Sequence, residues 1–357
     1  MTMSTILRFV TADGDALFET SLTSPSDDHI DLPGVVSLDD AGVPYKVVGS
    51  RVQGDQTIAV VEPYGEPDAA TVRPFHPSAP TRATVPSTDG VELALHQLGG
   101  SGPDLIICHA TGFHGLAYAP LARALAASFT VWAIDFRGHG ASTAPASGDF
   151  AWTGMAQDLL TCVDEIGSGS VRAVGHSLGG AAILLAELAR PGTIDGAYLF
   201  EPIAFPKDHL ASRKANPMSG PARRRREVFE SRRAALERYN SRPPLNELRL
   251  DALAAYVEHG FVDLADGSVT LACRPEHEAR TFESDEKLTI DRLDGLAIPL
   301  WVGAGRSDGS PGPAAFAPMI AAAVSGARLI DYEDLGHFGP LEDPDRIAAD
   351  IIDAFRG

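Results

Sequence analysis

Hydrophobic and polar positions alternate in a regular way from about residue 105 to the end of the chain. Short apolar runs bounded by turn-forming residues predict buried strands at 105–108, 130–134, 171–174, 197–200, 299–302 and 328–331. Longer amphipathic or alanine-rich segments between them predict helices at 118–127, 153–166, 178–190, 313–324 and 344–355. Strands that are apolar throughout and alternate with helices are typical of a mostly parallel sheet with helices on both faces. The sequence therefore predicts an α/β fold.

The first 80 residues have a different pattern. Apolar runs at 6–10, 45–48 and 57–61 are short and are separated by Asp-Gly, Pro-Gly and Gly-Asp pairs, which favours strands and turns over helices. A proline-rich stretch at 73–80 is typical of a linker. Beyond it, apolar runs at 83–85 and 91–97 flank an Asp-Gly pair and predict a hairpin. We therefore expect a small β-rich unit of unknown role at residues 1–80.

The alternation of strands and helices is interrupted once, for about a hundred residues that read as mostly helical. We interpret residues 203–297 as a helical lid, or cap, inserted into a core whose two parts are residues 81–202 and 298–357. The cap carries 16 of the 29 Lys and Arg residues and 16 acidic residues, so it is neutral in a chain of net charge -19.

The most basic run of the cap is a cluster of four consecutive arginines. Arg223 with Glu227, and Arg226 with Glu230, stand four residues apart, as ion pairs along one helix would. These arginines either belong to a solvated helix or form a cationic rim that attracts acidic substrates.

Composition excludes several classes of function. The acidic balance is opposite to that of a protein that binds nucleic acid phosphates. Cys108, Cys162 and Cys273 are too few and too dispersed for a disulfide framework or a zinc site, and they favour a reducing compartment. No secretory leader, membrane-spanning run, P-loop or dinucleotide fingerprint is present in the sequence. We therefore expect a cytoplasmic protein that uses neither a metal nor a cofactor.

The strongest local signal is the sequence Gly-His-Ser-Leu-Gly at 175–179. It follows a predicted apolar strand and opens a predicted helix, which is the setting of a nucleophile elbow, a sharp turn that exposes the serine hydroxyl. Ser177 is therefore the candidate nucleophile. A second match to the pattern, around Ser307, is followed by Ser-Pro-Gly-Pro instead of a helix, so we interpret Ser307 as a loop residue.

A serine nucleophile needs a base, which is itself oriented by an acid. The ends of parallel strands meet in one crevice, so both groups should stand just after strands. His337 and Asp308 do so, and the chain order Ser177, Asp308, His337 is the one that such triads follow. Glu201 also ends a predicted strand and is the alternative acid or a pocket residue.

The remaining site candidates surround these three residues. The N–H of Leu178, at the start of a helix, is a candidate oxyanion donor. The glycine-rich loop at 109–115 offers a second donor, for which we choose the N–H of Thr111. The other histidines near the site are candidate pocket residues: His109, His114 and His176.

Taken together, these motifs resemble the α/β-hydrolase superfamily. The matching stretches are His-Ala-Thr-Gly at 109–112, Asp-Phe-Arg-Gly-His-Gly-Ala-Ser at 135–142, the elbow at 175–179, Gly-Arg-Ser-Asp at 305–308 and Gly-His-Phe at 336–338. The resemblance runs from about residue 83 to 355 and implies the α/β-hydrolase fold with a helical lid of the esterase or lipase kind. Many members have His-Gly where this chain has His-Ala, and the first 80 residues have no counterpart.

The resemblance also separates reaction types. Haloalkane dehalogenases and epoxide hydrolases of this fold use aspartate where Ser177 stands, whereas serine implies acyl transfer from an ester, thioester or lactone. We therefore expect a carboxylesterase-like hydrolase of a small-molecule ester. Two alternatives are hydrolysis of a carbon–carbon bond in a diketone by the same triad, and a non-catalytic ligand-binding protein on a hydrolase scaffold. A further expectation is a homodimer in which residues 1–80 act as the dimerisation arm; the alternative is that they form a separate interaction module.

Overall fold

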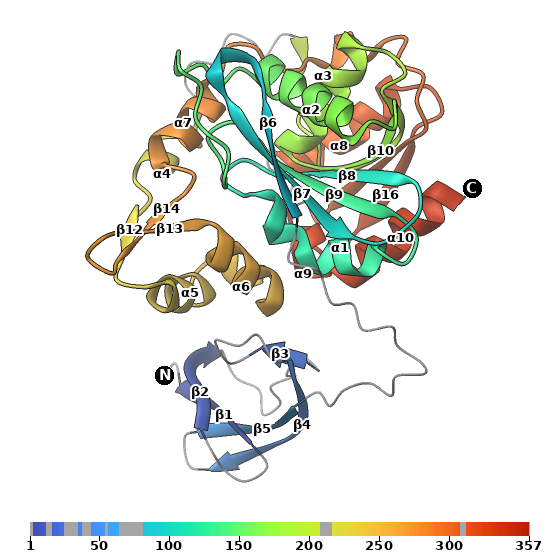
Figure 1. Ribbon diagram of the computed structural model, residues 1–357. Helices are drawn as coiled ribbons and strands as arrows, with labels where there is room; N and C mark the ends of the chain where they lie inside the picture. The colour runs from blue at the N-terminus through green and yellow to red at the C-terminus, as the bar shows by residue number, and fades with distance from the viewer. Residues whose placement is uncertain are drawn as a thin grey trace. The chain divides into compact units, whose positions relative to one another are not determined.

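The computed structural model describes residues 3–11, 16–24, 35–37, 44–53, 56–63, 81–207, 216–307 and 312–356 (Figure 1). The chain divides into two compact units, one formed by residues 1–76 together with 240–242 and the other by residues 77–239 together with 243–357. This boundary lies close to the one predicted at residue 80. The proline-rich stretch at 73–80 lies outside the described residues.

The second unit is built on an eight-stranded sheet in the order β16-β15-β11-β10-β8-β9-β7-β6. The five pairings from β9 through β8, β10, β11 and β15 to β16 are parallel, while β6–β7 and β7–β9 are antiparallel. The strands are β6 (Thr81–Pro86), β7 (Glu92–Gly99), β8 (Asp104–Cys108), β9 (Thr130–Asp135), β10 (Val171–His176), β11 (Ile194–Phe200), β15 (Leu300–Gly305) and β16 (Arg328–Tyr332). The mostly parallel sheet and the hairpin ahead of it confirm the prediction.

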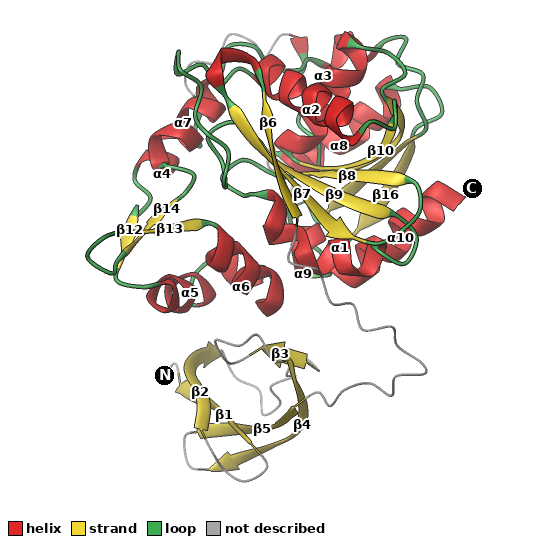
Figure 2. Ribbon diagram, viewed as in Figure 1, coloured by secondary structure: helices red, strands yellow, loops and turns green. Residues whose placement is uncertain are grey.

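Helices cover both faces of this sheet, as Figure 2 shows. One buried apolar cluster joins the sheet to three helices, α2 (Trp152–Ile166), α3 (Leu178–Ala189) and α8 (Pro313–Ala323). A second cluster joins the other face to α1 (Ala119–Leu125) and α10 (Pro344–Arg356). Helix α3 is apolar on all sides and almost wholly buried, which fixes the position of its first turn relative to the strand that precedes it.

The first unit contains five strands in the order β2-β1-β5-β4-β3. They are β1 (Met3–Thr11), β2 (Ala16–Ser24), β3 (Val35–Ser37), β4 (Pro44–Gln53) and β5 (Gln56–Pro63). Strands β1 and β5 are parallel and the other pairs are antiparallel. Each of the three apolar runs noted in this region lies within a strand, which confirms the expectation of a small β-rich unit.

The cap contains helices, as predicted, and also a small sheet that the sequence analysis did not predict. Besides its helices it contains a three-stranded antiparallel sheet in the order β12-β14-β13. Its elements are α4 (Ser219–Arg223), β12 (Val228–Phe229), α5 (Arg232–Asn240), α6 (Leu250–His259), β13 (Phe261–Asp263), β14 (Val269–Leu271) and α7 (Pro275–Glu283). Buried Phe229, Phe261 and Leu271 anchor this sheet in the second apolar cluster, so the cap packs on the core.

The arginine run of the cap does not form one helix. Helix α4 ends at Arg223, whose guanidinium binds Glu276 and Glu283 of α7 instead of Glu227. Arg226 does pair with Glu230, at 2.7 Å, but across strand β12. Carboxylates therefore bind both of these arginines, which weakens the argument for a cationic rim.

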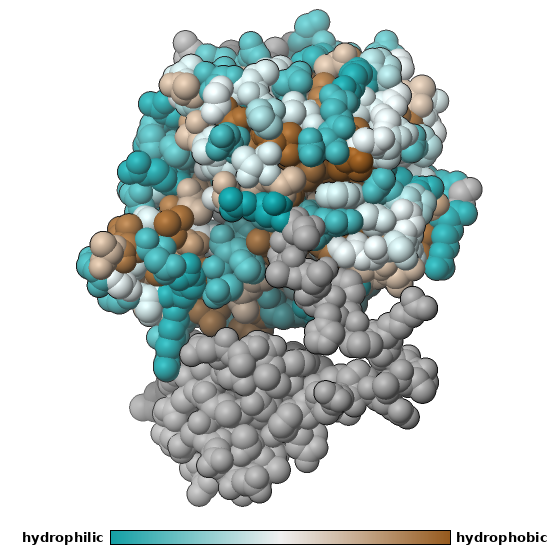
Figure 3. All heavy atoms as spheres, in the orientation of Figure 1, coloured by the Kyte–Doolittle hydropathy of each residue, from teal (hydrophilic) through white to brown (hydrophobic). Residues whose placement is uncertain are grey.

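The drawn face of the second unit is mostly hydrophilic in Figure 3, with apolar residues in separate groups. Among the described side chains, Val228 and Val262 are large hydrophobic residues exposed on the cap strands. None of the described helices is long and apolar enough to cross a membrane.

A buried ion pair ties the loop after β9 to helix α2. Both side chains are at most 3% exposed, and Arg137 binds the two carboxylate oxygens of Asp158 at 2.7 and 2.8 Å. Ser87, at the end of the first hairpin strand, donates a further hydrogen bond to Asp158 at 2.7 Å. Three separate segments therefore depend on one carboxylate.

We predict that Asp158→Asn lowers the free energy of unfolding by about 3–5 kcal/mol, because it leaves the buried guanidinium of Arg137 without a counter-ion. Urea denaturation measures this loss. The matched control is Asp164→Asn, whose partner Arg190 is exposed, so that its loss stays below about 1 kcal/mol. Equal losses in the two variants would contradict the role given to the buried pair.

Candidate active site

The predicted elbow is present between β10 and α3. Ser177 has φ 54° and ψ -114°, a strained conformation for a residue other than glycine, which turns the chain sharply from strand to helix. The flanking glycines allow this close approach, because a Cβ on Gly175 would lie 2.7 Å from Gly180 and one on Gly179 would lie 2.0 Å from the Cys108 carbonyl oxygen. The serine therefore stands at the carboxyl end of a central strand, at the start of a buried helix.

His337 lies on the loop between β16 and α9 (Gly339–Glu342) and is partly exposed, with 31% of its side chain accessible. Its Nδ1 atom donates a hydrogen bond to Oε2 of Glu201 over 2.6 Å. Glu201 is 1% exposed, and its other oxygen, Oε1, accepts the N–H of Gly305 at 2.8 Å. Both oxygens of this buried carboxylate thus have a donor, and one of the donors is the candidate base.

This contact brings Glu201, the alternative acid of the sequence analysis, to Nδ1 of His337. A neutral imidazole with a proton on Nδ1 has one hydrogen to donate there, and Glu201 accepts it. Asp308, expected in this place, lies outside the described residues. Glu201 follows β11 directly and has φ 44°, so the chain bends at the strand end and turns the carboxylate toward the histidine. Among the described residues, Glu201 is therefore the carboxylate in contact with Nδ1 of His337.

The loop that carries His337 is held from both sides by one side chain that the sequence interpretation missed. The carboxylate of Glu342 accepts the N–H of Gly336 at 2.8 Å and the N–H of Phe338 at 3.1 Å. Burial raises the pKa of Glu342, with the nearby Glu247 carboxylate adding to the effect. The residues on either side of His337 therefore share one anchor.

The three other histidine candidates are buried and have structural partners. His109 accepts the N–H of Phe136 at Nε2 and bonds the Ala110 carbonyl through Nδ1. His114 donates from Nε2 to the carbonyl oxygen of Tyr256 at 3.1 Å. These two are at most 2% exposed, and burial lowers their pKa values to about 3 and about 4. His109 and His114 therefore hold neighbouring backbone groups in place and have little surface that could contact a substrate. The third histidine, His176, has a hydrogen-bond partner at each ring nitrogen.

The two candidate oxyanion donors lie at the starts of different elements. Leu178 is the first residue of α3, where an N–H has no acceptor within the helix. Thr111 is half-buried in the loop after β8. The end of that loop is fixed by Asp135, which accepts the N–H of Gly115 at 2.7 Å.

The cap contacts the same loop through groups that sequence reasoning did not identify. The hydroxyl of Tyr256 donates to the Gly112 carbonyl at 3.3 Å, and Arg225 donates to that hydroxyl at 2.8 Å. Arg225 also pairs with Glu278 at 2.5 Å, and a Cβ on Gly112 would lie only 3.0 Å from the Glu278 carboxylate. The cap therefore rests directly on the backbone next to Thr111.

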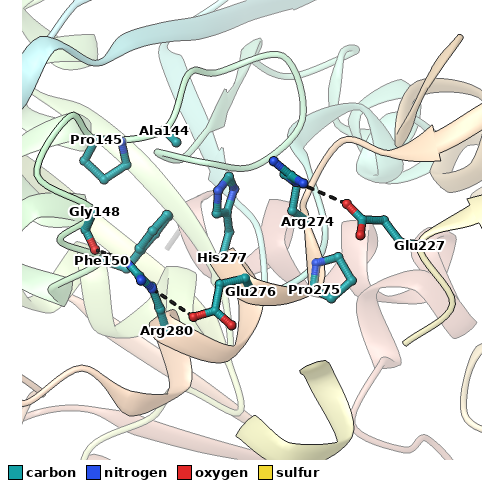
Figure 4. Close-up of a pocket in the computed structure, with 10 residues that line it drawn as sticks. All are labelled: Ala144, Pro145, Gly148, Phe150, Glu227, Arg274, Pro275, Glu276, His277 and Arg280. Atoms are coloured by element: carbon teal, nitrogen blue, oxygen red, sulfur yellow. Dashed lines mark hydrogen bonds and ion pairs between the residues drawn. The ribbon is translucent and has the colours of Figure 1, made fainter. Parts of the chain in front are cut away.

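A separate cavity of about 340 Å³ lies between the loop at 144–150 and helix α7 of the cap. Figure 4 shows Arg274, His277 and Arg280 along one side of it, with Arg274 bound to Glu227 and Arg280 bound to Glu276. None of the predicted catalytic residues lines this cavity. No group of three or more His, Cys, Asp or Glu side chains that could hold a metal ion occurs among the described residues.

We predict that the protein loses stability as the pH falls below about 6.5, the ordinary pKa of histidine, because His114 accepts a proton in the unfolded chain but not in the folded one until about pH 4. The contribution of His114 to the free energy of unfolding is therefore fully present above about pH 6.5, and it decreases as the pH falls from 6.5 to about 4. In His114→Gln, whose side-chain amide can still donate to Tyr256, the free energy of unfolding should fall less between pH 7 and pH 5. Urea denaturation at both pH values checks this; an unchanged pH dependence would contradict it.

Comparison with known proteins agrees with the fold. The model of a family described as the alpha/beta hydrolase family matches residues 105–350. Haloalkane dehalogenase 2 of Mycobacterium tuberculosis is 26% identical over 263 residues, which cover 72% of this chain and 89% of that protein.

Two solved structures show the same likeness. E-2-(acetamidomethylene)succinate hydrolase has a TM-score of 0.64 at 20% identity, covering 78% of this chain and 100% of that one. An esterase from Rhodococcus sp. ECU1013 has a TM-score of 0.60 at 20% identity, covering 77% of this chain and 98% of that one. At this identity the two structures bear on the fold alone. Because the family model spans well over half of the sequence, the chain belongs to the alpha/beta hydrolase family.

Proposed function

We propose that this protein is a serine hydrolase that cleaves a carboxylic ester, thioester or lactone through an acyl-enzyme on Ser177. The observation that carries the proposal is the pair His337–Glu201, joined over 2.6 Å, in a fold whose elbow presents a serine. A buried acid on Nδ1 keeps the proton there and leaves Nε2 free to accept one, which is the tautomer that a general base requires. Membership of the family supports hydrolysis as the overall reaction.

In the proposed reaction, the Ser177 hydroxyl attacks the substrate carbonyl while Nε2 of His337 takes the hydroxyl proton. The carbonyl oxygen becomes an oxyanion, for which the N–H groups of Leu178 and Thr111 are the proposed donors. His337 then gives its proton to the leaving alcohol or thiol, and the acyl group stays on Ser177. Water then attacks the carbonyl carbon of the acyl-enzyme while His337 takes a proton from it. His337 gives this proton to the Ser177 oxygen, which releases the carboxylic acid and restores the serine.

The identity of residue 177 favours acyl transfer over dehalogenation, although one relative is a haloalkane dehalogenase. Dehalogenases of this fold use an aspartate at the elbow, because they form an ester between its carboxylate and the substrate carbon. A serine hydroxyl forms an ester with an acyl group instead. The proposed substrates are therefore compounds with an acyl carbon.

We predict that a fluorophosphonate probe labels the protein and that p-nitrophenyl esters of graded acyl length are hydrolysed. Both activities should disappear in Ser177→Ala, because the nucleophile is gone, and both should persist in Ser307→Ala, the matched control at the second pattern match. Mass spectrometry of the labelled peptides locates the probe. Labelling that survives in Ser177→Ala would overturn the elbow as the site, and cleavage of a diketone without ester hydrolysis would favour the carbon–carbon alternative.

We further predict that Glu201→Gln lowers kcat by about 10⁴-fold, the loss found when the acid of such a triad becomes an amide, since the imidazole then holds the wrong tautomer. Asp308→Asn is the matched variant and should retain at least about a tenth of the activity, because Glu201 already occupies Nδ1. Steady-state kinetics on the best ester measures both. A larger loss in Asp308→Asn than in Glu201→Gln would return the acid role to Asp308.

A further inference from the structure

A chain of hydrogen bonds links three loops of the site behind the elbow. The N–H of Ala110, on the loop of the oxyanion candidate, donates to the hydroxyl oxygen of Tyr118 over 3.2 Å. The same hydroxyl lies 2.7 Å from Nδ1 of His176. Nε2 of His176 lies 2.8 Å from the backbone carbonyl oxygen of His337. Tyr118 and His176 are each 1% exposed, so solvent has little access to replace these bonds.

Chemistry fixes the direction of every bond in this chain. A carbonyl oxygen only accepts, so Nε2 of His176 carries a hydrogen and donates it to His337. Burial lowers the pKa of His176 well below its ordinary value, so the ring is neutral and Nδ1 is bare. The Tyr118 hydroxyl must then donate to Nδ1, which leaves its lone pairs to accept the Ala110 N–H. Each group has one role, and no alternative arrangement satisfies all three bonds.

Three members of this chain of hydrogen bonds, Ala110, His176 and His337, adjoin or belong to the groups that the proposed reaction uses. Ala110 immediately precedes Thr111, the proposed oxyanion donor, and His176 immediately precedes Ser177. The far end is the carbonyl of His337 itself, whose ring centroid lies 4.9 Å from that of His176. The oxyanion loop, the nucleophile and the base come from segments that are far apart in the sequence. This chain of hydrogen bonds connects all three segments.

We propose that Tyr118 and His176 are positioning residues, which hold the oxyanion loop and His337 in place relative to Ser177 through this chain of hydrogen bonds. The inference rests on the proposed function. Without the Tyr118 hydroxyl, Ala110 loses its acceptor and Nδ1 of His176 loses its donor. The proton of His176 stays on Nε2, toward the carbonyl of His337, but the ring is then held by a hydrogen bond on one side only.

The test is Tyr118→Phe, which removes one oxygen atom and keeps the ring. Its matched control is Tyr198→Phe, which removes an equally buried hydroxyl that bonds Tyr332 instead of the site. Three measurements are compared with the wild type: stability in urea, kcat and KM on a p-nitrophenyl ester, and ¹⁵N NMR of protein labelled at its histidines. His176→Gln assigns the His176 resonances.

We expect both variants to lose stability, but only Tyr118→Phe to lose activity. Its kcat should fall about tenfold with KM nearly unchanged, because misplaced groups weaken the transition state more than substrate binding. In the spectra, His176 should carry its proton on Nε2 in all three proteins, and only in Tyr118→Phe should the Nδ1 resonance of His176 shift, because that nitrogen loses its hydrogen bond.

Equal kcat values in Tyr118→Phe and Tyr198→Phe would overturn the inference, as would a wild-type His176 protonated mainly on Nδ1. These outcomes leave the proposed function intact, provided that Ser177 of the wild type is still labelled and esters are cleaved. Absence of both labelling and turnover in the wild type would instead overturn the proposed function and this inference together.

Discussion

The hydrogen bond between the Glu201 carboxylate and Nδ1 of His337 is the contact on which the geometry of the site depends. A carboxylate that is 1% exposed must have donors for its oxygens, and Glu201 obtains them from Gly305 and His337. Because Glu201 stands at the bent end of β11, between β10 and β15, this requirement draws the histidine loop over the carboxyl ends of the central strands. Glu342, bonded to the amides on both sides of His337, then fixes the orientation of the loop.

The architecture of the second unit could be predicted from sequence because its signals are long and local. Each parallel strand is a continuous apolar run, and the observed strands begin and end within a few residues of those runs. The elbow is equally predictable, because an apolar strand precedes the Gly-His-Ser-Leu-Gly sequence and a helix follows it. In the structure, a Cβ at position 175 or 179 would clash with neighbouring backbone. The position of His337 is predictable too, because it follows a strand that ends at the same edge of the sheet.

The contact of Glu201 with His337 and the small sheet of the cap could not be predicted from the sequence in this way, for two physical reasons. The neighbouring parallel strands β11 and β15 end at one edge of the sheet, and in the sequence Glu201 follows the first and Asp308 the second. The backbone bend that turns Glu201 toward His337 is not signalled by its side chain. In the cap, strands of two or three residues such as β12 and β14 are shorter than the window over which periodicity is detectable. Contacts such as Tyr118 with His176 join residues 58 positions apart and leave no local pattern.

The most direct test of the proposed mechanism is a crystal structure of the protein after reaction with an aryl phosphate triester, which phosphorylates activated serines. The proposed mechanism predicts a phosphoryl group on Oγ of Ser177, one of its oxygens facing the N–H groups of Leu178 and Thr111, and Nδ1 of His337 still bound to Glu201. A phosphoryl group on Ser307, or an imidazole whose Nδ1 is bound by Asp308, would contradict it.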